Sequence, residues 1–303
     1  MRIVSCLRCP GLLAALFALA ASMAARNQEA PAPGLTPSPT PVPAPASELA
    51  SSPETSESPE APARARSVEG AIIINFPSTD TPPPRTLQLH FTHRFSDPVQ
   101  ESDIHNLFSF DSGAEVGIGL SYTPIKNLEI GFLRERTLED YEFSAKYTIL
   151  SGDFPIHAAI RIGDDWRTER GYPDQFSFFV QGIASAVLFE RVRISAVPTF
   201  SSKAAGQRFV LPIRENVFNV LFAVSGAITR TINVHAELVP RHAESPGAGW
   251  IVSLEKTLLR HRFAFTAGNL KSTTVDQYIA PDLNGLPRSN IYLGFNIVRQ
   301  WKL

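Results

Sequence analysis

Residues 141–150 read YEFSAKYTIL, a stretch in which apolar and polar side chains alternate at nine consecutive positions. The apolar positions are Tyr141, Phe143, Ala145, Tyr147 and Ile149, and the polar positions between them are Glu142, Ser144, Lys146 and Thr148. In a β-strand successive side chains point to opposite faces, whereas an amphipathic helix repeats about every 3.6 residues. The stretch therefore predicts a strand with one apolar face and one polar face.

Segments with the same period of two follow one another along the chain after residue 85. We predict twelve strands, near residues 86–95, 114–123, 128–136, 140–150, 156–162, 175–187, 191–199, 216–228, 231–239, 249–257, 261–270 and 290–299. Several run nine residues or more, and a tilted strand needs about 9 to 11 residues to cross a bilayer. Strands of ordinary globular proteins are shorter, about 5 to 6 residues.

The connections after the first predicted strand alternate between long and short. Short links are expected at 124–127, 151–155, 189–190, 230 and 258–260, and longer ones at 96–113, 163–174, 200–215, 240–248 and 271–289. Residues 137–139 break this rule, because a short link stands where a long one is due. An even number of strands with tight turns at one end is typical of outer-membrane barrels, whose termini and tight turns lie in the periplasm. The long loops are therefore expected to face outward.

This pattern predicts an all-β fold, a closed antiparallel up-and-down transmembrane β-barrel of about 12 strands. A soluble sandwich or lipocalin-like barrel is the alternative, with the apolar face as its core and the polar face in water. Small residues such as Gly117, Gly119 and Ser144 on the polar face favour the membrane barrel. So do aromatic residues near strand ends, which form girdles at membrane interfaces. These are Phe95, Tyr122, Phe132, Tyr141, Tyr147 and Trp250.

Charge and hydropathy exclude two other classes of protein. The chain has 28 basic and 29 acidic residues, and a net charge of -1 gives no electrostatic reason to expect a nucleic-acid partner. The mean hydropathy is -0.03. A helical protein that crosses the membrane several times needs repeated apolar runs of about 20 residues, whereas a barrel alternates apolar and polar positions and keeps the average near zero.

The N-terminal third of the chain divides into three segments. Residues 1–24 read as a cleaved signal peptide, with Arg2 and Arg8 before an apolar run and a small-residue cleavage site at its end. Both cysteines lie inside it, so the mature chain is expected to contain no thiol. Residues 25–66 are rich in Pro, Ala and Ser and predict a disordered linker. Residues 67–85 form a lead-in segment with a short predicted strand at 71–76, and the barrel domain spans 86–303.

One part of the chain carries a resemblance to a known family. Residues 89–97 read LHFTHRFSD, and residues 106–132 read NLFSFDSGAEVGIGLSYTPIKNLEIGF before the strand at 141–150. These stretches resemble a bacterial family of single-domain β-barrel proteins of unknown function, of the outer-membrane barrel type, and the likeness covers about residues 87–303. The resemblance implies the same barrel and envelope setting but no reaction. The chain departs from many outer-membrane barrels by not ending on an aromatic residue, although Tyr292, Phe295 and Trp301 lie near its end.

If the apolar parity faces lipid, a set of charged residues faces the barrel lumen. The lumen-lining candidates are five cations and five carboxylates: Arg94, Lys146, Arg161, Arg193, Arg262, Glu115, Glu129, Glu142, Glu237 and Glu255. Charges are admissible there because water and opposite charges solvate them, while an Arg or Lys at mid-depth on the lipid face costs about 2 to 4 kcal/mol. Two interpretations remain open: the pairs brace the wall and partly close the lumen, or they line a narrow polar pore.

No catalytic motif is visible in the sequence, and we expect no enzyme activity, no cofactor and no metal. His90, His157 and His235 share the inward parity, which leaves a metal or haem site as a less favoured alternative. Asp164, Asp165 and Glu169 fall in a predicted outer loop, where they could hold Ca²⁺ or cations that bridge lipopolysaccharide. A solvated acidic loop is the interpretation we prefer.

The expected function is therefore that of an outer-membrane barrel that acts as a narrow polar channel or a transport-associated envelope component. The alternatives are a soluble periplasmic ligand-binding barrel and a barrel hydrolase. Expected partners are outer-membrane lipids and lipopolysaccharide, the barrel assembly machinery through the C-terminal strand, and a cell-wall or periplasmic partner through the linker. The expected location is the bacterial outer membrane.

Overall fold

The computed structural model describes residues 70–152, 155–171, 173–189, 191–205, 214–241, 247–280 and 290–303. The predicted signal peptide and the Pro-rich linker lie outside the described residues.

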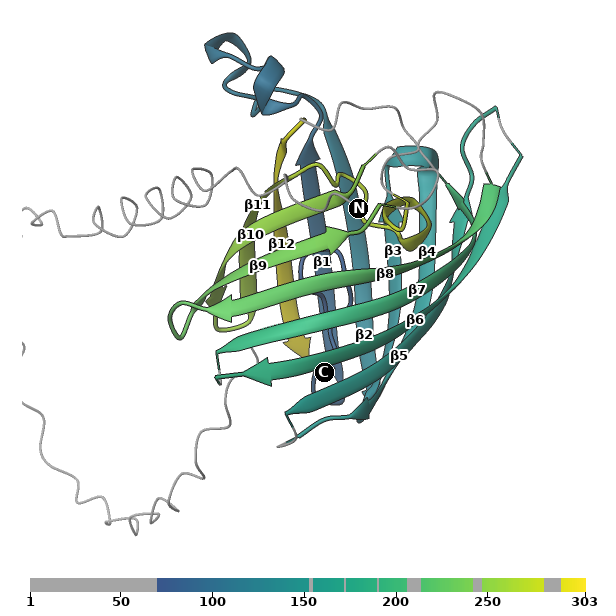
Figure 1. The fold of residues 1–303 in the computed structure, drawn as a ribbon, viewed down its shortest axis with the longest axis vertical. Helices are drawn as coiled ribbons and strands as arrows, with labels where there is room; N and C mark the ends of the chain where they lie inside the picture. The colour runs from purple at the N-terminus through teal and green to yellow at the C-terminus, as the bar shows by residue number, and fades with distance from the viewer. Residues whose placement is uncertain are drawn as a thin grey trace, which may run out of the picture. The chain divides into compact units, whose positions relative to one another are not determined.

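Twelve antiparallel strands form one closed barrel, as the sequence predicts (Figure 1). They are β1 (Thr86–Phe95), β2 (Ala114–Ile125), β3 (Leu128–Glu135), β4 (Asp140–Leu150), β5 (Ile156–Arg167), β6 (Gln175–Leu188), β7 (Val192–Ala205), β8 (Arg214–Ala227), β9 (Ile232–Val239), β10 (Gly249–Leu258), β11 (His261–Gly268) and β12 (Tyr292–Lys302). Each strand pairs with its neighbours in the sequence, and β1 pairs with both β2 and β12. The up-and-down topology is confirmed.

The orientation of the two strand faces is also confirmed. Ile118, Ile130 and Phe143 are about half exposed on the outer surface. In contrast, Arg94 and Lys146 are among the most deeply buried side chains of the chain, with 1% and 2% exposure. A soluble barrel would show the reverse arrangement, because its apolar face would form the core. The outer surface is therefore the apolar one, as a bilayer requires.

The two ends of the barrel differ in their connections. At the short-turn end lie both barrel termini and the tight links, such as residues 126–127 and 259–260. At the long-loop end, the β1–β2 connection contains the 3₁₀ turns η1 (Val99–Glu101) and η2 (Ile104–Asn106) and projects beyond the strands (Figure 1). The short exception predicted at 137–139 is the 3₁₀ turn η3 (Thr137–Glu139).

Aromatic side chains gather at the long-loop end of the outer surface. The ring centroids of Tyr141 and Trp166 lie 5.6 Å apart, and those of Trp166 and Phe176 lie 5.9 Å apart in a stacked arrangement. Such amphipathic rings are favoured where hydrocarbon meets the polar membrane surface. This cluster marks one interface of the membrane-spanning band.

The long loop predicted at 163–174 is partly wrong, because β5 continues to Arg167. Asp164 pairs with Phe143 and Asp165 pairs with Glu142 across the β4–β5 ladder. The alternation of inward and outward positions therefore continues past the two acidic residues. Asp165 faces the lumen and is fully buried, instead of lying in a solvated outer loop.

Two irregular segments fill the lumen, and neither placement matches the sequence prediction. The lead-in residues 71–76 form no strand; they bend inside the barrel, with a single β-bridge between Ile72 and Pro77. The predicted outer loop at 271–289 is wrong for residues 271–280, which turn inward and include the short helix α2 (Val275–Tyr278). The two segments meet where the rings of Phe76 and Tyr278 lie 5.2 Å apart. The apolar residues of both segments are buried inside the barrel, whereas a solvated loop would expose them to water. This burial explains why both segments turn inward.

A small apolar core holds the two segments against one side of the wall. Ile73, Ile74 and Phe76 of the lead-in segment belong to one buried cluster with Val275 and Tyr278. The wall contributes inward-facing residues from β6 to β10, namely Phe179, Ile183, Val197, Leu221, Val239 and Ile251. The inner face therefore carries an apolar patch among its polar residues, which the sequence prediction of an evenly polar lumen did not capture.

Among the helices of the described residues, none is long and apolar enough to cross a membrane.

We predict that a charge on the outer surface destabilises the barrel according to its depth. Ile162→Arg, near the middle of β5, should lower the free energy of unfolding by about 2 to 4 kcal/mol, whereas Ile149→Arg, beside the short-turn end, should lower it by about 0 to 1 kcal/mol. Reversible denaturation in lipid vesicles, followed by tryptophan fluorescence, measures both. Equal losses at the two positions would contradict a membrane-spanning outer surface.

Candidate functional site

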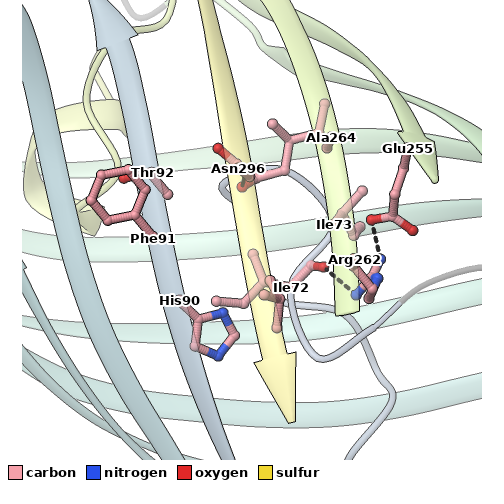
Figure 2. A pocket seen from close by; sticks show the side chains of 11 residues that line it. Ile72, Ile73, His90, Phe91, Thr92, Glu255, Arg262, Ala264 and Asn296 are labelled. Atoms are coloured by element: carbon pink, nitrogen blue, oxygen red, sulfur yellow. Dashed lines mark hydrogen bonds and ion pairs between the residues drawn. The ribbon is translucent and has the colours of Figure 1, made fainter. Parts of the chain in front are cut away.

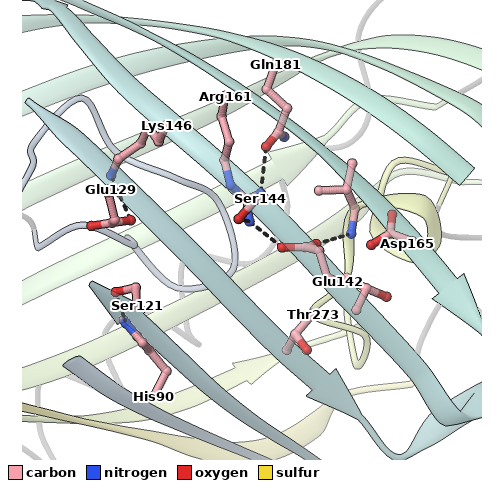
Figure 3. Close-up of polar contacts among 12 residues, drawn as sticks. His90, Ser121, Glu129, Glu142, Ser144, Lys146, Arg161, Asp165, Gln181 and Thr273 are labelled. Carbon is pink, nitrogen blue, oxygen red and sulfur yellow. Dashed lines mark hydrogen bonds and ion pairs between the residues drawn. The ribbon is translucent and has the colours of Figure 1, made fainter. Parts of the chain in front are cut away.

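Six of the ten lumen-lining candidates form three ion pairs within the wall. Lys146 Nζ lies 3.5 Å from Glu129 Oε1, and Arg262 Nη2 lies 2.7 Å from Glu255 Oε2. Arg161 pairs with Glu142 and also donates to Gln181 Oε1 at 2.9 Å (Figure 3). Each pair joins neighbouring strands, and Lys146 lies directly opposite Glu129 in the β3–β4 ladder.

Glu237 of β9 holds the tip of the lead-in segment. Its carboxylate accepts the backbone N–H groups of Ile74 at 2.8 Å, Asn75 at 2.9 Å and Phe76 at 2.9 Å. These N–H groups belong to a bend that makes no β-ladder, so an ionised acceptor satisfies donors that would otherwise be buried and unpaired. Glu237 therefore binds the backbone of this segment and does not take part in one of the three wall ion pairs.

Arg94, Lys146 and Arg193 hold the lead-in segment from other directions. Arg94 donates to the side-chain oxygen of Asn75 at 3.1 Å. Lys146 Nζ donates to the backbone oxygens of Ala71 at 3.0 Å and Asp80 at 2.8 Å, so it binds this segment in addition to Glu129. Arg193 forms an ion pair of 2.8 Å with the Asp80 carboxylate.

Hydroxyl contacts fix the same segment near the short-turn end. Thr79 Oγ1 lies 2.9 Å from Ser185 Oγ, and Thr81 Oγ1 lies 2.7 Å from Thr148 Oγ1. The segment is therefore held along its length by polar groups from several strands of the wall.

Glu115, the tenth candidate, neither forms one of the three wall ion pairs nor holds the lead-in segment. It is half-buried on β2 near the long-loop end, and the charged groups that act on it are Lys271 and Arg136. Its position opposite Arg94 in the β1–β2 ladder does not produce an ion pair, because Arg94 turns toward Asn75 and Asn296.

Wall carboxylates also hold the segment 271–280, and most of these residues were missed from the sequence. Glu135 Oε2 accepts the N–H groups of Thr273 at 2.8 Å and Thr274 at 3.1 Å. Glu142 Oε2 accepts the N–H of Val275 at 3.0 Å, and Asp165 Oδ2 accepts that of Asp276 at 3.0 Å. Glu135 lies at an inward position within the strand predicted at 128–136, and Asp165 would have been found if the alternation had been followed past residue 162. Asp276 carries no such signal, because it lies in a loop.

Burial inside the barrel changes the pKa values of groups on this segment. Burial raises the pKa of the Asp276 carboxyl well above its ordinary value, and the neighbouring Asp140 carboxylate raises it further, while Arg167 opposes this shift. Burial likewise raises the pKa of the Tyr278 hydroxyl, which accepts a hydrogen bond of 3.0 Å from Gln181. Tyr278 therefore serves here as a neutral structural group.

The three inward histidines do not form one site. His90 lies 3.2 Å from Ser121 Oγ (Figure 3). His235 Nδ1 lies 2.8 Å from Ser225 Oγ, and His157 is buried on β5. Within the described ranges, the group whose side chains could share one metal ion is instead Asp140, Asp165 and Asp276. Among these, only Asp165 belongs to the acidic group that the sequence singled out.

A cavity remains between the lead-in segment and strands β1, β10, β11 and β12 (Figure 2). Its volume is about 30 Å³, and it is lined by Ile72, His90, Glu255, Arg262 and Asn296 among others. One water molecule needs about 10 to 15 Å³ measured in this way, whereas sites for small organic ligands span about 300 to 1,000 Å³. This cavity has room for about two waters and not for a solute.

The fold and the inverted arrangement of its faces define the chain as a membrane β-barrel. A family model described as "Membrane bound beta barrel domain (DUF5777)" matches residues 69–301, and the chain belongs to this family. The match includes the lead-in residues 70–81 as well as the strands. No curated protein matches the chain.

Solved outer-membrane barrels show distant likeness. The NanC porin is 12% identical with a TM-score of 0.44, over 72% of this chain and 100% of that chain. Outer membrane phospholipase A from Escherichia coli is 12% identical with a TM-score of 0.40, over 73% of this chain and 93% of that chain. At these values the likenesses carry no argument about activity.

We predict that Lys146→Met destabilises the protein more than the loss of one surface charge would. The substitution leaves Glu129 buried without its cation and leaves two backbone oxygens of the lead-in segment without a donor, and breaking a buried pair typically costs about 3 to 5 kcal/mol. Lys146→Met/Glu129→Gln should recover part of this loss, because no unpaired carboxylate remains. A double-mutant cycle of unfolding free energies in detergent measures the coupling, and strictly additive effects would contradict the pairing.

Proposed function

We propose that this protein is an outer-membrane transport component whose barrel holds residues 70–81 of the lead-in segment as a removable plug. The observation that carries the proposal is the chemistry of the contacts. Glu237, Lys146, Arg94 and Arg193 hold the segment through hydrogen bonds and ion pairs, which water can replace. In this account the described state is closed.

The wall supports such a change because much of its charge is balanced without the segment. Lys146 keeps Glu129, Arg262 keeps Glu255, and Arg161 keeps Glu142 when residues 70–81 leave the lumen. A polar wall that regains water is admissible in a barrel of twelve strands, which encloses more space than its own side chains fill. The narrow polar channel expected from the sequence would then be the open state.

Apolar contacts make the closed state the resting one. Withdrawing Ile73, Ile74 and Phe76 from the wall exposes apolar surface, at about 25 cal/mol per Å². Opening therefore requires an input of free energy, and tension on the chain that precedes residue 70 would act directly on the segment. This is the role we propose for a periplasmic or cell-wall partner of the linker.

The remaining expected partners follow from the same account. Outer-membrane lipids and lipopolysaccharide would surround the apolar outer surface, and the barrel assembly machinery would recognise β12, which carries Phe295 and Trp301. We also infer that the barrel itself is not catalytic.

We predict that Glu237→Gln raises the frequency of channel opening in planar bilayers. Three N–H groups lose an ionised acceptor, and hydrogen bonds to charged groups contribute about 1.5 to 3 kcal/mol, which corresponds to roughly tenfold or more in the open population. Asp164→Asn, on the outward parity of β5, is the matched control and should leave the currents unchanged.

A disulfide lock then tests the plug directly. Thr79→Cys/Ser185→Cys joins two positions whose hydroxyls lie 2.9 Å apart, in a mature chain that is expected to contain no other thiol. Added to Glu237→Gln, the oxidised lock should abolish the currents and reduction should restore them, while the currents of Glu237→Gln/Ser185→Cys, which has a single thiol, should not respond to oxidation. Currents that persist through the oxidised lock, or Glu237→Gln protein that never conducts, would refute the proposal.

A hydrolase remains the second candidate because of one arrangement in the wall. Ser225 Oγ lies 2.8 Å from His235 Nδ1, and Glu255 Oε1 lies 3.9 Å from His235 Nε2. This is the order of nucleophile, base and orienting carboxylate. All three side chains are buried, however, and Glu255 already pairs with Arg262. Ester hydrolysis by the purified protein that disappears in Ser225→Ala would favour this candidate over our inference of a non-catalytic barrel.

A further inference from the structure

Three aspartates from distant parts of the chain meet inside the barrel near the long-loop end. Asp140 begins β4, Asp165 lies on β5, and Asp276 lies in α2. Each is fully buried, and one carboxylate oxygen from each lies within 4.8 Å of the others. Two wall strands and the inward-turned segment 271–280 therefore contribute to one acidic centre.

The hydrogen-bond donors around this centre do not satisfy it. Asp140 Oδ2 accepts from Thr274 Oγ1 and from Gln277 Nε2, each at 2.9 Å, and Asp165 Oδ2 accepts the N–H of Asp276. The Thr274 hydroxyl also lies 3.2 Å from Asp276 Oδ1, but its single proton can serve only one of the two carboxylates at a time.

Two carboxylate oxygens remain buried without a partner. In the described part of the chain, Asp140 Oδ1 and Asp165 Oδ1 are inaccessible to solvent and accept no hydrogen bond. Buried polar atoms in folded proteins almost always have a partner in the protein, in water or in a bound ion. The two free oxygens thus point to a group that binds both of them.

The formal charges around this centre indicate the charge of that group. Arg167 is the cation that pairs with the centre, through Asp276 Oδ2 at 3.0 Å. Three carboxylates and one guanidinium leave a formal charge of -2. The adjacent Arg161 already pairs with Glu142, so it does not balance this charge. Unbalanced charge of this kind is strongly unfavourable in a buried site, so a dication would restore the balance.

We propose that Asp140, Asp165 and Asp276 bind a divalent cation with a preference for oxygen ligands, and that Ca²⁺ binds better than Mg²⁺. Carboxylate oxygens are the ligands both ions prefer. Mg²⁺ retains several waters in a strict octahedral arrangement, whereas Ca²⁺ accepts several carboxylates in flexible geometry. A fully buried centre formed by three side chains suits the second ion.

The position of the centre gives the ion a structural role. Asp140 and Asp165 belong to the wall, while Asp276 belongs to the segment that closes the lumen from the long-loop end. The bound ion would tie this segment to β4 and β5. The proposal does not depend on conductance or on the lead-in segment, so it can fail while the proposed function stands, and the reverse also holds.

The test is calcium binding by the full chain, purified in detergent and stripped with a chelator. Titration with CaCl₂ in a calorimeter should show one ion per chain, with a dissociation constant of about 10⁻⁴ to 10⁻³ M, the range of extracellular calcium modules. MgCl₂ should bind more weakly. Asp276→Asn and Asp165→Asn should abolish the calcium heat, and Asp164→Asn, the neighbouring carboxylate on the opposite face of β5, should retain it.

Thermal unfolding provides a second measurement, which still tests the proposal if one of the variants does not fold. Calcium should raise the melting temperature of the wild type and of Asp164→Asn, but not that of Asp165→Asn. In chelator, Asp165→Asn should melt above the wild type, because one of three mutually repelling carboxylates is gone. Wild-type protein that shows no saturable calcium heat and no calcium-dependent shift would overturn the proposal and would indicate that protons neutralise the centre. Unchanged binding by Asp276→Asn would also overturn it.

Discussion

Every backbone N–H and C=O group inside a bilayer must find its partner within the protein, because hydrocarbon offers none. The pairing of β1 with β12, from Thr86 opposite Lys302 to Arg94 opposite Gly294, meets this requirement by removing the last free strand edges. Closure also decides where each side chain goes. Once one parity of every strand must face lipid, the charged parity has no other place than the lumen.

A charged lumen creates a second requirement, since twelve strands enclose more space than the inward side chains occupy. Two irregular segments supply the missing atoms, and wall carboxylates satisfy both in the same way. Glu237 accepts the N–H groups of Ile74 to Phe76, while Glu135 accepts those of Thr273 and Thr274. Backbone without regular secondary structure is thereby tolerated at membrane depth, because side-chain carboxyl oxygens replace the ladder acceptors that it lacks.

The strands and their faces could be predicted from the sequence because a period of two is a local property. Even the end of β5 carries that signal: Asp165 faces inward and Trp166 outward, and only the two adjacent acidic residues suggested a loop. The contents of the lumen carry no comparable signal. Ile74 and Glu237 are 163 positions apart, and their contact depends on the closed barrel and not on any neighbouring residue.

The candidate site shows the same division. Inward parity identified Lys146, Glu237 and Arg262 as lumen residues, but it assigned no ion pair among them. It could not show that Glu237 binds backbone N–H groups, since that partner comes from a segment without periodicity. Asp276 is the extreme case, because nothing in its local sequence distinguishes it from the acidic residues of an ordinary solvated loop.

The wall side chains that contact the two irregular segments differ in their charge. The lead-in segment meets three cations, Arg94, Lys146 and Arg193, and one carboxylate, Glu237. The segment 271–280 meets Glu135, Asp140, Glu142 and Asp165 with few cations between them. The proposed pulling partner would therefore act on a segment held mainly by cations, whereas the proposed cation would act on a segment held mainly by carboxylates.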